Sequence, residues 1–139
     1  GQMMDLEAEN RTLSVDEIIR LQRLKTGEMF AVSCEAGAIL GTAPAKMRSA
    51  LRRYAHDMGL AFQIRDDLLD AEGKREETGK AVNKDKAAGK ATLIEALGID
   101  RAKEQSKTLA QQAINHLDVF DKKADILREL ADFVVTRRS

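Results

Sequence analysis

The chain has 139 residues, of which 43% are hydrophobic and 4% aromatic, with no tryptophan and one proline. This length suffices for one domain with a hydrophobic core and is too short for two, and the composition favours helices packed through Leu, Ile, Val and Ala. The 23 basic residues balance the 23 acidic ones, which argues against a nucleic-acid-binding module and against a polybasic membrane contact.

The cysteine content and the hydropathy pattern bear on where the protein works. Its single cysteine, Cys34, has no partner for a disulfide within the chain, and we expect it to be a small core residue. The sequence contains no secretory or membrane-spanning apolar run. We therefore expect a protein of the reducing cytoplasm.

The first strong helix signal begins at Ser14. Ser14 and Glu17 have the spacing of a capping box, in which each side chain binds the backbone N–H of the other residue. Apolar residues then recur at helical spacing up to Leu40. The pattern predicts a helix over about 14–41.

A second long helix is predicted after a short break. The sequence GTAP at 41–44 interrupts the pattern, and Pro44 suits the first turn of a helix that we expect to run to about Ala71. We expect Gly73 to end this helix. Residues 72–89 lack apolar periodicity and are rich in Gly, Lys and Glu, which predicts a long polar loop of the kind that often carries function.

The remaining sequence predicts three shorter helices. The first spans residues 90–97 and ends at Gly98. Two amphipathic helices follow, and their apolar stripes consist of Ala102, Leu109, Ala113, Leu117 and Phe120, and of Leu127, Leu130, Ala131 and Val134. Without a strand pattern or an internal repeat, the predicted class is all-α.

Three aspartates, Asp66, Asp67 and Asp70, lie near the end of the second predicted helix. At about 100° per residue, their carboxylates share one arc of the helix, in which Gln63 also falls. Gly59, one heptad before Asp66, leaves backbone space above it. Mg²⁺ takes one or two protein carboxylates and leaves its other positions to water and substrate phosphate. The cluster therefore predicts a site for a magnesium-bound phosphate.

An acidic helix end in solvent is the alternative interpretation of the same residues. Such an end would pair with Arg65 or Lys74 and would need no ligand. The spacing DDxxD alone does not decide between the two interpretations.

One lysine of the first helix stands out. Lys25 falls on a stripe with residues spaced by seven, namely Ile18, Lys25, Val32 and Ile39. A buried ammonium group needs an anion, although a lysine that reaches solvent or pairs with a nearby Glu would show the same spacing. Thr26 and Gly27 directly after it loosen a helix and could kink it beside a ligand.

Two further lysines follow glycines in the predicted loop. Lys80 follows Gly79 and Lys90 follows Gly89, where the backbone can approach an anion closely. This is no P-loop, since GxxxxGK[ST] is absent. We expect Lys80 and Lys90 to contact phosphate. We assign Lys74, Arg75, Lys84 and Lys86 to the solvated surface of the loop.

Four separated motifs together resemble a known family. GQMMDL (1–6), LKTGEMF (24–30), FQIRDDLLD (62–70) and GKAVNKDKAAGKAT (79–92) are similar, in order, to motifs of the trans-polyprenyl diphosphate synthases, which include farnesyl and geranylgeranyl diphosphate synthases. The resemblance implies an all-helical isoprenoid synthase fold, usually in homodimers. It also implies a reaction in which an allylic diphosphate ionises and the resulting carbocation is attacked by isopentenyl diphosphate.

The resemblance assigns roles to the aspartates. In this family two aspartate-rich motifs hold three Mg²⁺ ions on the allylic diphosphate. Asp66, Asp67 and Asp70 match the second motif, in which Asp66 is the main ligand of the third metal and the other two act directly or through water.

The resemblance also assigns substrate contacts. Lys25 matches the lysine of the KT motif, and Lys80 matches the lysine after the second aspartate-rich motif; both contact the leaving diphosphate. Thr26 and Gln63 match residues that line the same pocket. Lys90 corresponds to a lysine near the mouth of the site.

The chain departs from the family in what it lacks. The first aspartate-rich motif, its adjacent arginines and the upstream Gly-Lys, Arg and His positions for isopentenyl diphosphate are absent. Residues 1–139 thus resemble the C-terminal half of a synthase. We expect the chain alone to be inactive and to be part of a larger enzyme that supplies the missing N-terminal half.

Two other functions share some of these features. A non-catalytic helical partner, similar to the regulatory small subunits of some prenyl synthases, would not need a cluster of like charges. A terpene cyclase or squalene-type synthase shares the carboxylates, but the lysines of the KT and GK motifs argue against it. The sequence has no Glu-x-x-His pair for a di-iron site, and we expect His56 and His116 to be polar residues on helix surfaces.

Overall fold

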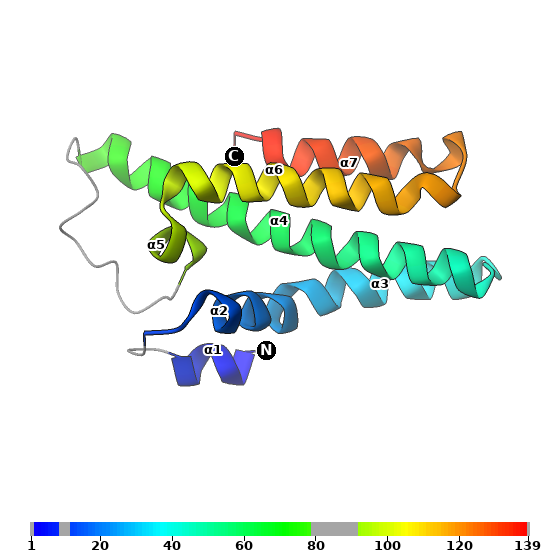
Figure 1. The fold of residues 1–139 in the computed structure, drawn as a ribbon, viewed down its shortest axis with the longest axis horizontal. Coiled ribbons are helices and arrows are strands. Elements are labelled where there is room, and N and C mark those ends of the chain that lie inside the picture. Colours follow the sequence, from blue (N-terminus) through cyan, green and yellow to red (C-terminus); the bar gives the residue numbers. More distant parts are fainter. Residues whose placement is uncertain (1, 9–11, 79–91, 139) are drawn as a thin grey trace.

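The computed structural model describes residues 2–8, 12–78 and 92–138, and every regular element within these ranges is helical (Figure 1). The α-helices are α1 (Gln2–Ala8), α2 (Val15–Gln22), α3 (Glu28–Leu40), α4 (Ala45–Thr78), α5 (Leu93–Leu97), α6 (Ile99–His116) and α7 (Asp125–Thr136). A π-helical segment, η1 (Arg23–Gly27), joins α2 to α3, and two 3₁₀ turns, η2 (Leu117–Val119) and η3 (Lys122–Ala124), lie between α6 and α7. The predicted all-α class is confirmed. No described helix combines the length and the apolar content that crossing a membrane requires.

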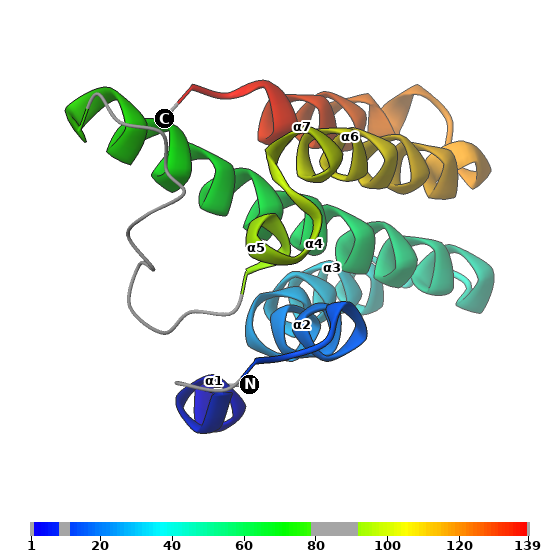
Figure 2. The same cartoon turned by 60° about the vertical axis from the view of Figure 1, so that its left-hand side comes forward.

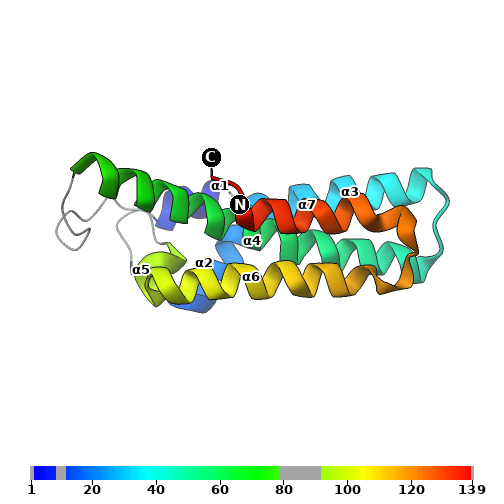
Figure 3. The same ribbon diagram turned by 90° about the horizontal axis from the view of Figure 1, so that it is seen from above.

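Helix α4, with 34 residues, lies at the centre of the fold. Helix α3 runs antiparallel along one side of it, and α6 and α7 pack along the other side (Figures 1 and 2). The C-terminal half of α4 extends past the end of α7 and lies at the same end of the bundle as α2 and α5 (Figure 3). This end carries the aspartate cluster.

The core consists of two apolar clusters along α4. One joins α4 to α3, α6 and α7 and includes Tyr54, Met58, Leu117 and Val134. The other joins α4 to α2, α5 and α6 and includes Ile18, Ile64, Leu68, Leu93 and Leu109. Many of the buried residues are alanines, so the helices approach one another closely. Cys34 packs against the first cluster but remains partly exposed, and burial raises the pKa of its thiol.

The first predicted helix is confirmed, with one irregularity. The capping box forms as predicted: Ser14 N donates to a Glu17 carboxylate oxygen at 2.9 Å, and Glu17 N donates to Ser14 Oγ at 3.3 Å. The helical path continues to Leu40 but widens into η1, where the N–H of Glu28 bonds the carbonyl of Arg23. This π-helical turn contains Thr26 and Gly27, where the sequence indicated a loosened helix.

The predicted heptad stripe through Lys25 is wrong because of this wide turn. A π-helical turn shifts the phase of all residues that follow it. The buried positions Gln22 and Gly27 are accordingly five residues apart. Ile18 is buried, whereas Lys25 is exposed, as are Val32 and Ile39.

Helix α4 begins as predicted but ends later. The carbonyl of Pro44 accepts the first helical hydrogen bonds, so Pro44 stands directly before the first turn. Gly73 does not end the helix, which continues to Thr78. Glycines that end helices commonly adopt a positive φ angle, and Gly98 is the glycine with a positive φ among the described residues. An interior glycine costs only about 1 kcal/mol relative to alanine.

The later predictions are confirmed where the structure describes them. Gly98, at φ 84°, ends α5, and the side chain of Thr92 caps its start by accepting from Glu95 N. Of the predicted loop over 72–89, residues 72–78 are helical and the others lie outside the described residues. Residues 90 and 91 of the predicted 90–97 helix also lie outside them.

Two helices present large apolar side chains to solvent. On α3 these are Met29, Val32, Ile39 and Leu40. On α7 they are Ile126, Leu130 and Phe133, with Phe133 60% exposed. Scattered exposed apolar residues are common on proteins, but here several of them share one helix in each case.

Candidate functional site

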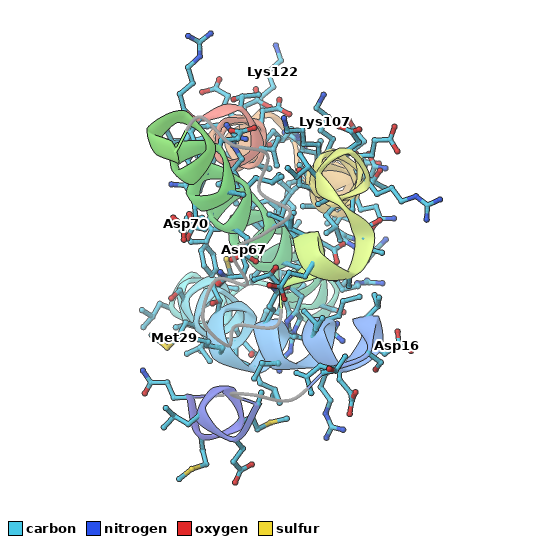
Figure 4. All side chains as sticks on the ribbon, turned by 90° about the vertical axis from the view of Figure 1, so that its left-hand side faces the viewer. Asp16, Met29, Asp67, Asp70, Lys107 and Lys122 are labelled. Carbon is cyan, nitrogen blue, oxygen red and sulfur yellow. The ribbon has the colours of Figure 1, made fainter. Side chains whose placement is uncertain are left out.

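The aspartate cluster lies on the part of α4 that faces α2 and η1. Figure 4 shows Asp67 on the flank of α4 next to these segments, with Asp70 further along the same helix. Each of the three carboxylates has a different environment, although all three share one arc of the helix. The three aspartates therefore do not form one group: amides contact Asp67, whereas Asp66 and Asp70 line a cleft.

Asp67 is held by amide side chains from two helical segments. Gln22 Nε2 donates to Asp67 Oδ2 at 3.2 Å, and Gln63 Nε2 donates to Asp67 Oδ1 at 3.3 Å. Thr26 Oγ1 in turn donates to Gln63 Oε1 at 3.0 Å. The predicted site residues Thr26, Gln63 and Asp67 are thus brought together. Sequence reasoning missed Gln22, although it lies one helical turn before Thr26.

η1 lies so close to α4 that side chains around it come within hydrogen-bonding distance of α4. Gly59 on α4 and Gly27 in η1 are both buried, and a Cβ added to Gly59 would lie only 3.0 Å from the Cα of Gly27. Two facing glycines let the backbones meet without intervening side chains. The space predicted above Asp66 at Gly59 is therefore taken up by the backbone of η1.

Asp66 pairs with Arg137, a residue that follows α7. Its carboxylate accepts a hydrogen bond from Arg137 Nη2. The Arg137 guanidinium also lies over the ring of Phe62, 4.6 Å from its centroid. Arg65 Nη2 donates to the backbone carbonyl of Arg137 at 2.6 Å, which ties this segment to α4. Sequence reasoning missed Arg137, because no local pattern connects a residue after α7 with α4.

Asp66 and Asp70 line one cleft of about 600 Å³. The other lining residues are Arg65, Leu69, Glu72, Gly73, Arg137 and Arg138. Glu72 pairs with Lys103 Nζ at 2.8 Å, and this hydrogen bond lowers the pKa of the Glu72 carboxyl. The cleft thus combines carboxylate ligands with guanidinium groups, which is the mixture that a metal-bound phosphate requires.

The carboxylates of this cleft suit a hard divalent cation, although the described side chains alone do not fill its coordination shell. Within residues 2–8, 12–78 and 92–138, no three His, Cys, Asp or Glu side chains form a group that would hold a metal ion by themselves. Mg²⁺ needs only one or two carboxylates when water and phosphate complete its shell. Asp66 and Asp70 supply two carboxylates on one cleft. The metal roles of Asp66, Asp67 and Asp70 stay predictions.

The predicted lysines are only partly described. Lys25 lies in η1, next to Thr26, and is exposed. Lys80 and Lys90 lie outside the described residues. Their contacts with phosphate stay predictions.

Both histidines are less peripheral than predicted. The side chain of His56 is only 13% exposed, and its buried Nδ1 has no hydrogen-bond partner among the described residues. Burial, together with the charge of Arg23, lowers the pKa of His56. His116 Nε2 lies 3.0 Å from a carboxylate oxygen of Asp57 and so connects α6 to α4. Helical spacing alone does not reveal these contacts.

Comparison with known sequences identifies a family for this chain. The sequence model of the polyprenyl synthetase family matches residues 1–131. A farnesyl diphosphate synthase of Geobacillus stearothermophilus is 39% identical over 137 residues, which are 99% of this chain and 46% of the relative. A geranylgeranyl diphosphate synthase of Cyanophora paradoxa is 35% identical over 100% of this chain and 47% of its own length. The chain therefore spans about half the length of these curated relatives.

Solved structures show the same fold. An FPP/GFPP synthase from Zymomonas mobilis, in its apo form, superposes with a TM-score of 0.80 at 42% identity, over 96% of this chain and 43% of that one. A geranylgeranyl pyrophosphate synthetase from the archaeon Geoglobus acetivorans gives a TM-score of 0.82 at 28% identity, over 98% of this chain and 52% of that one. The family match, the shared helical fold and the aspartate cluster on α4 lead to one conclusion: this chain belongs to the polyprenyl synthetase family.

Proposed function

We propose that the protein containing this chain is a Mg²⁺-dependent prenyltransferase, which condenses an allylic diphosphate with isopentenyl diphosphate into a longer trans-polyprenyl diphosphate. One observation carries the proposal: Asp66 and Asp70 line a single cleft beside arginine side chains, while amides hold the neighbouring Asp67. The farnesyl and geranylgeranyl diphosphate synthases among the relatives support this reaction class.

The aspartates would hold the metal and the cations would hold the substrate. Asp66 and Asp70, with Asp67 beside them, would bind Mg²⁺, which offsets negative charge on the diphosphate when bound. Lys25 in η1 would bind the diphosphate as a compact charge, as would Lys80 and Lys90. These fixed charges stabilise the leaving diphosphate most as its bond to the allylic carbon breaks. Thr26 would act by holding Gln63, and through it Asp67.

The apolar faces of α3 and α7 would pack against the rest of the enzyme. Both faces carry large exposed apolar side chains, such as Met29 and Phe133, and burying them there would remove them from water. The cation formed from the allylic substrate must be kept from water, which requires an apolar enclosure. We expect the chain alone to be inactive. A homodimer and a cytoplasmic location stay predictions.

The test is an Asp66→Ala substitution in the full-length protein. Turnover should fall by orders of magnitude, while the far-UV circular dichroism spectrum and the unfolding temperature stay close to those of the wild type. Asp118→Ala is a matched control, since Asp118 lies in η2 at the opposite end of the bundle (Figure 1). Near-normal turnover of the Asp66 variant would remove this residue from the site, whereas a full-length wild type without turnover would favour the non-catalytic helical partner.

A further inference from the structure

Gln22 is a buried polar side chain to which the proposed reaction gives no role of its own. It ends α2, directly before η1, and only 8% of its surface is exposed. Its Nε2 reaches Asp67 Oδ2, 45 residues away in the sequence, at 3.2 Å. An ionised carboxylate accepts hydrogen bonds and cannot donate them, so the amide nitrogen must be the atom that faces Asp67.

The oxygen of the Gln22 amide differs from its nitrogen in its hydrogen bonding. Gln22 Oε1 is buried and has no hydrogen-bond partner among the described residues. Buried amide oxygens are normally paired, so among the described residues this amide is held by the bond from its Nε2 to Asp67.

Asp67 differs from the two aspartates that line the cleft. An amide contacts each of its carboxylate oxygens, Gln22 on Oδ2 and Gln63 on Oδ1. The two amides come from different helical segments, so the orientation of this carboxylate depends on how η1 and α2 pack against α4. Side chains that orient the ligands of a metal in this way determine its affinity without touching it.

We propose that Gln22 is a positioning residue for the cation at the acidic end of α4. Its N–H group holds Asp67 in the orientation that the cation requires. This inference rests on the proposed function, because it presupposes that Mg²⁺ and a diphosphate bind beside Asp67.

The first experiment compares Gln22→Met with wild type in the full-length protein. Methionine keeps the length of the side chain but offers neither the N–H donor nor the amide oxygen. Calorimetric titration with inorganic pyrophosphate in the presence of Mg²⁺ should show an affinity loss of roughly 10- to 100-fold, as for other residues that orient metal ligands. The unfolding temperature without metal should not fall, because the substitution also removes an unpaired buried oxygen. Gln105→Met on the exposed face of α6 is the control.

A second comparison tests whether Gln22 acts through Asp67. In an Asp67→Ala background, Gln22→Met should weaken pyrophosphate binding clearly less than it does in the wild type, because the group it orients is already gone. An equal loss in both backgrounds would overturn the proposal. So would a lower unfolding temperature with unchanged affinity, which is the signature of a purely structural role.

The design separates this inference from the proposed function. If the wild-type protein shows no Mg²⁺-assisted uptake of pyrophosphate, the proposed function itself fails. If the wild type binds and Gln22→Met binds equally well, only the role of Gln22 is refuted.

Discussion

Replacing Gly59 by alanine tests the close approach of η1 to α4 on which the site depends. The added Cβ would lie 3.0 Å from Gly27 Cα, 3.5 Å from Phe30 Cδ2 and 3.6 Å from Gly27 N. The nearest neighbour is backbone, which cannot turn away as the end of a side chain can. The segment η1 must therefore move away from α4 by a few tenths of an ångström.

Two opposing contributions determine the size of the effect. Alanine in place of an interior helical glycine stabilises by about 1 kcal/mol. Overpacking a closely packed contact costs about 1–3 kcal/mol. Because η1 is continuous with α2 and α3, it cannot move away from α4 without shifting these helices. We therefore expect a net destabilisation on the order of 1 kcal/mol. Gly37→Ala on α3 is the matched control: no described atom lies within 4 Å of its added Cβ, so it should stabilise by about 1 kcal/mol.

The assay is urea-induced unfolding of the full-length variants, followed by circular dichroism. The two substitutions should move the unfolding midpoint in opposite directions, with a gap of about 2 kcal/mol between them. Gly59→Ala should also weaken Mg²⁺-dependent pyrophosphate binding, since moving η1 lengthens the hydrogen bonds from Gln22 and Thr26. A Gly59 variant as stable as the Gly37 variant would refute the steric reasoning.

Three further substitutions test other contacts of the described structure. Tyr54→Phe should lower the unfolding free energy by about 1 kcal/mol, because it removes the hydrogen bond that the buried hydroxyl donates at 2.8 Å to the carbonyl of Leu127 in α7. Burial raises the pKa of Tyr54, so the stabilisation by its neutral hydroxyl should persist below about pH 10 and be lost at higher pH. A stability profile without an alkaline decline would contradict this prediction. Burial lowers the pKa of His56, so the wild type should lose stability as the pH falls below about 6.5, and His56→Leu should lose less between pH 7 and 5; equal slopes in urea titrations at several pH values would count against this. Arg137→Leu should strengthen Mg²⁺ binding measured by calorimetry without diphosphate, because Asp66 no longer has to exchange its guanidinium partner for the metal, and an unchanged affinity would show that the pair does not compete.

Features that depend on neighbours within one helical turn were predictable. The capping box at Ser14 and Glu17 formed as the spacing indicated, and Gly98 ended α5. The widened turn at Thr26 and Gly27 lies where the sequence indicated a loosened helix. These features follow from residues three to five positions apart, whose contacts hardly depend on the rest of the fold.

Other predictions failed where the helix geometry differed from the one that the local pattern assumed. The heptad stripe through Lys25 assumed an unbroken α-helix, but the π-helical turn moved Lys25 to the exposed side. Gly73 was expected to end α4, yet the helix continues past it. An interior glycine costs only about 1 kcal/mol and does not force a helix to end, and a π-helical turn shifts the phase of every later residue.

By itself, the sequence determined the all-α class, the family resemblance and the positions of the aspartates along α4. Only the tertiary structure showed that Gln22 meets Asp67 across 45 residues and that Arg137 meets Asp66 across 71. Helical periodicity reports which residues share a face of one helix, and it carries no information about which face of another helix will lie opposite. That choice depends on the packing of α2, η1 and the end of α7 against α4, and it places these side chains around the cluster.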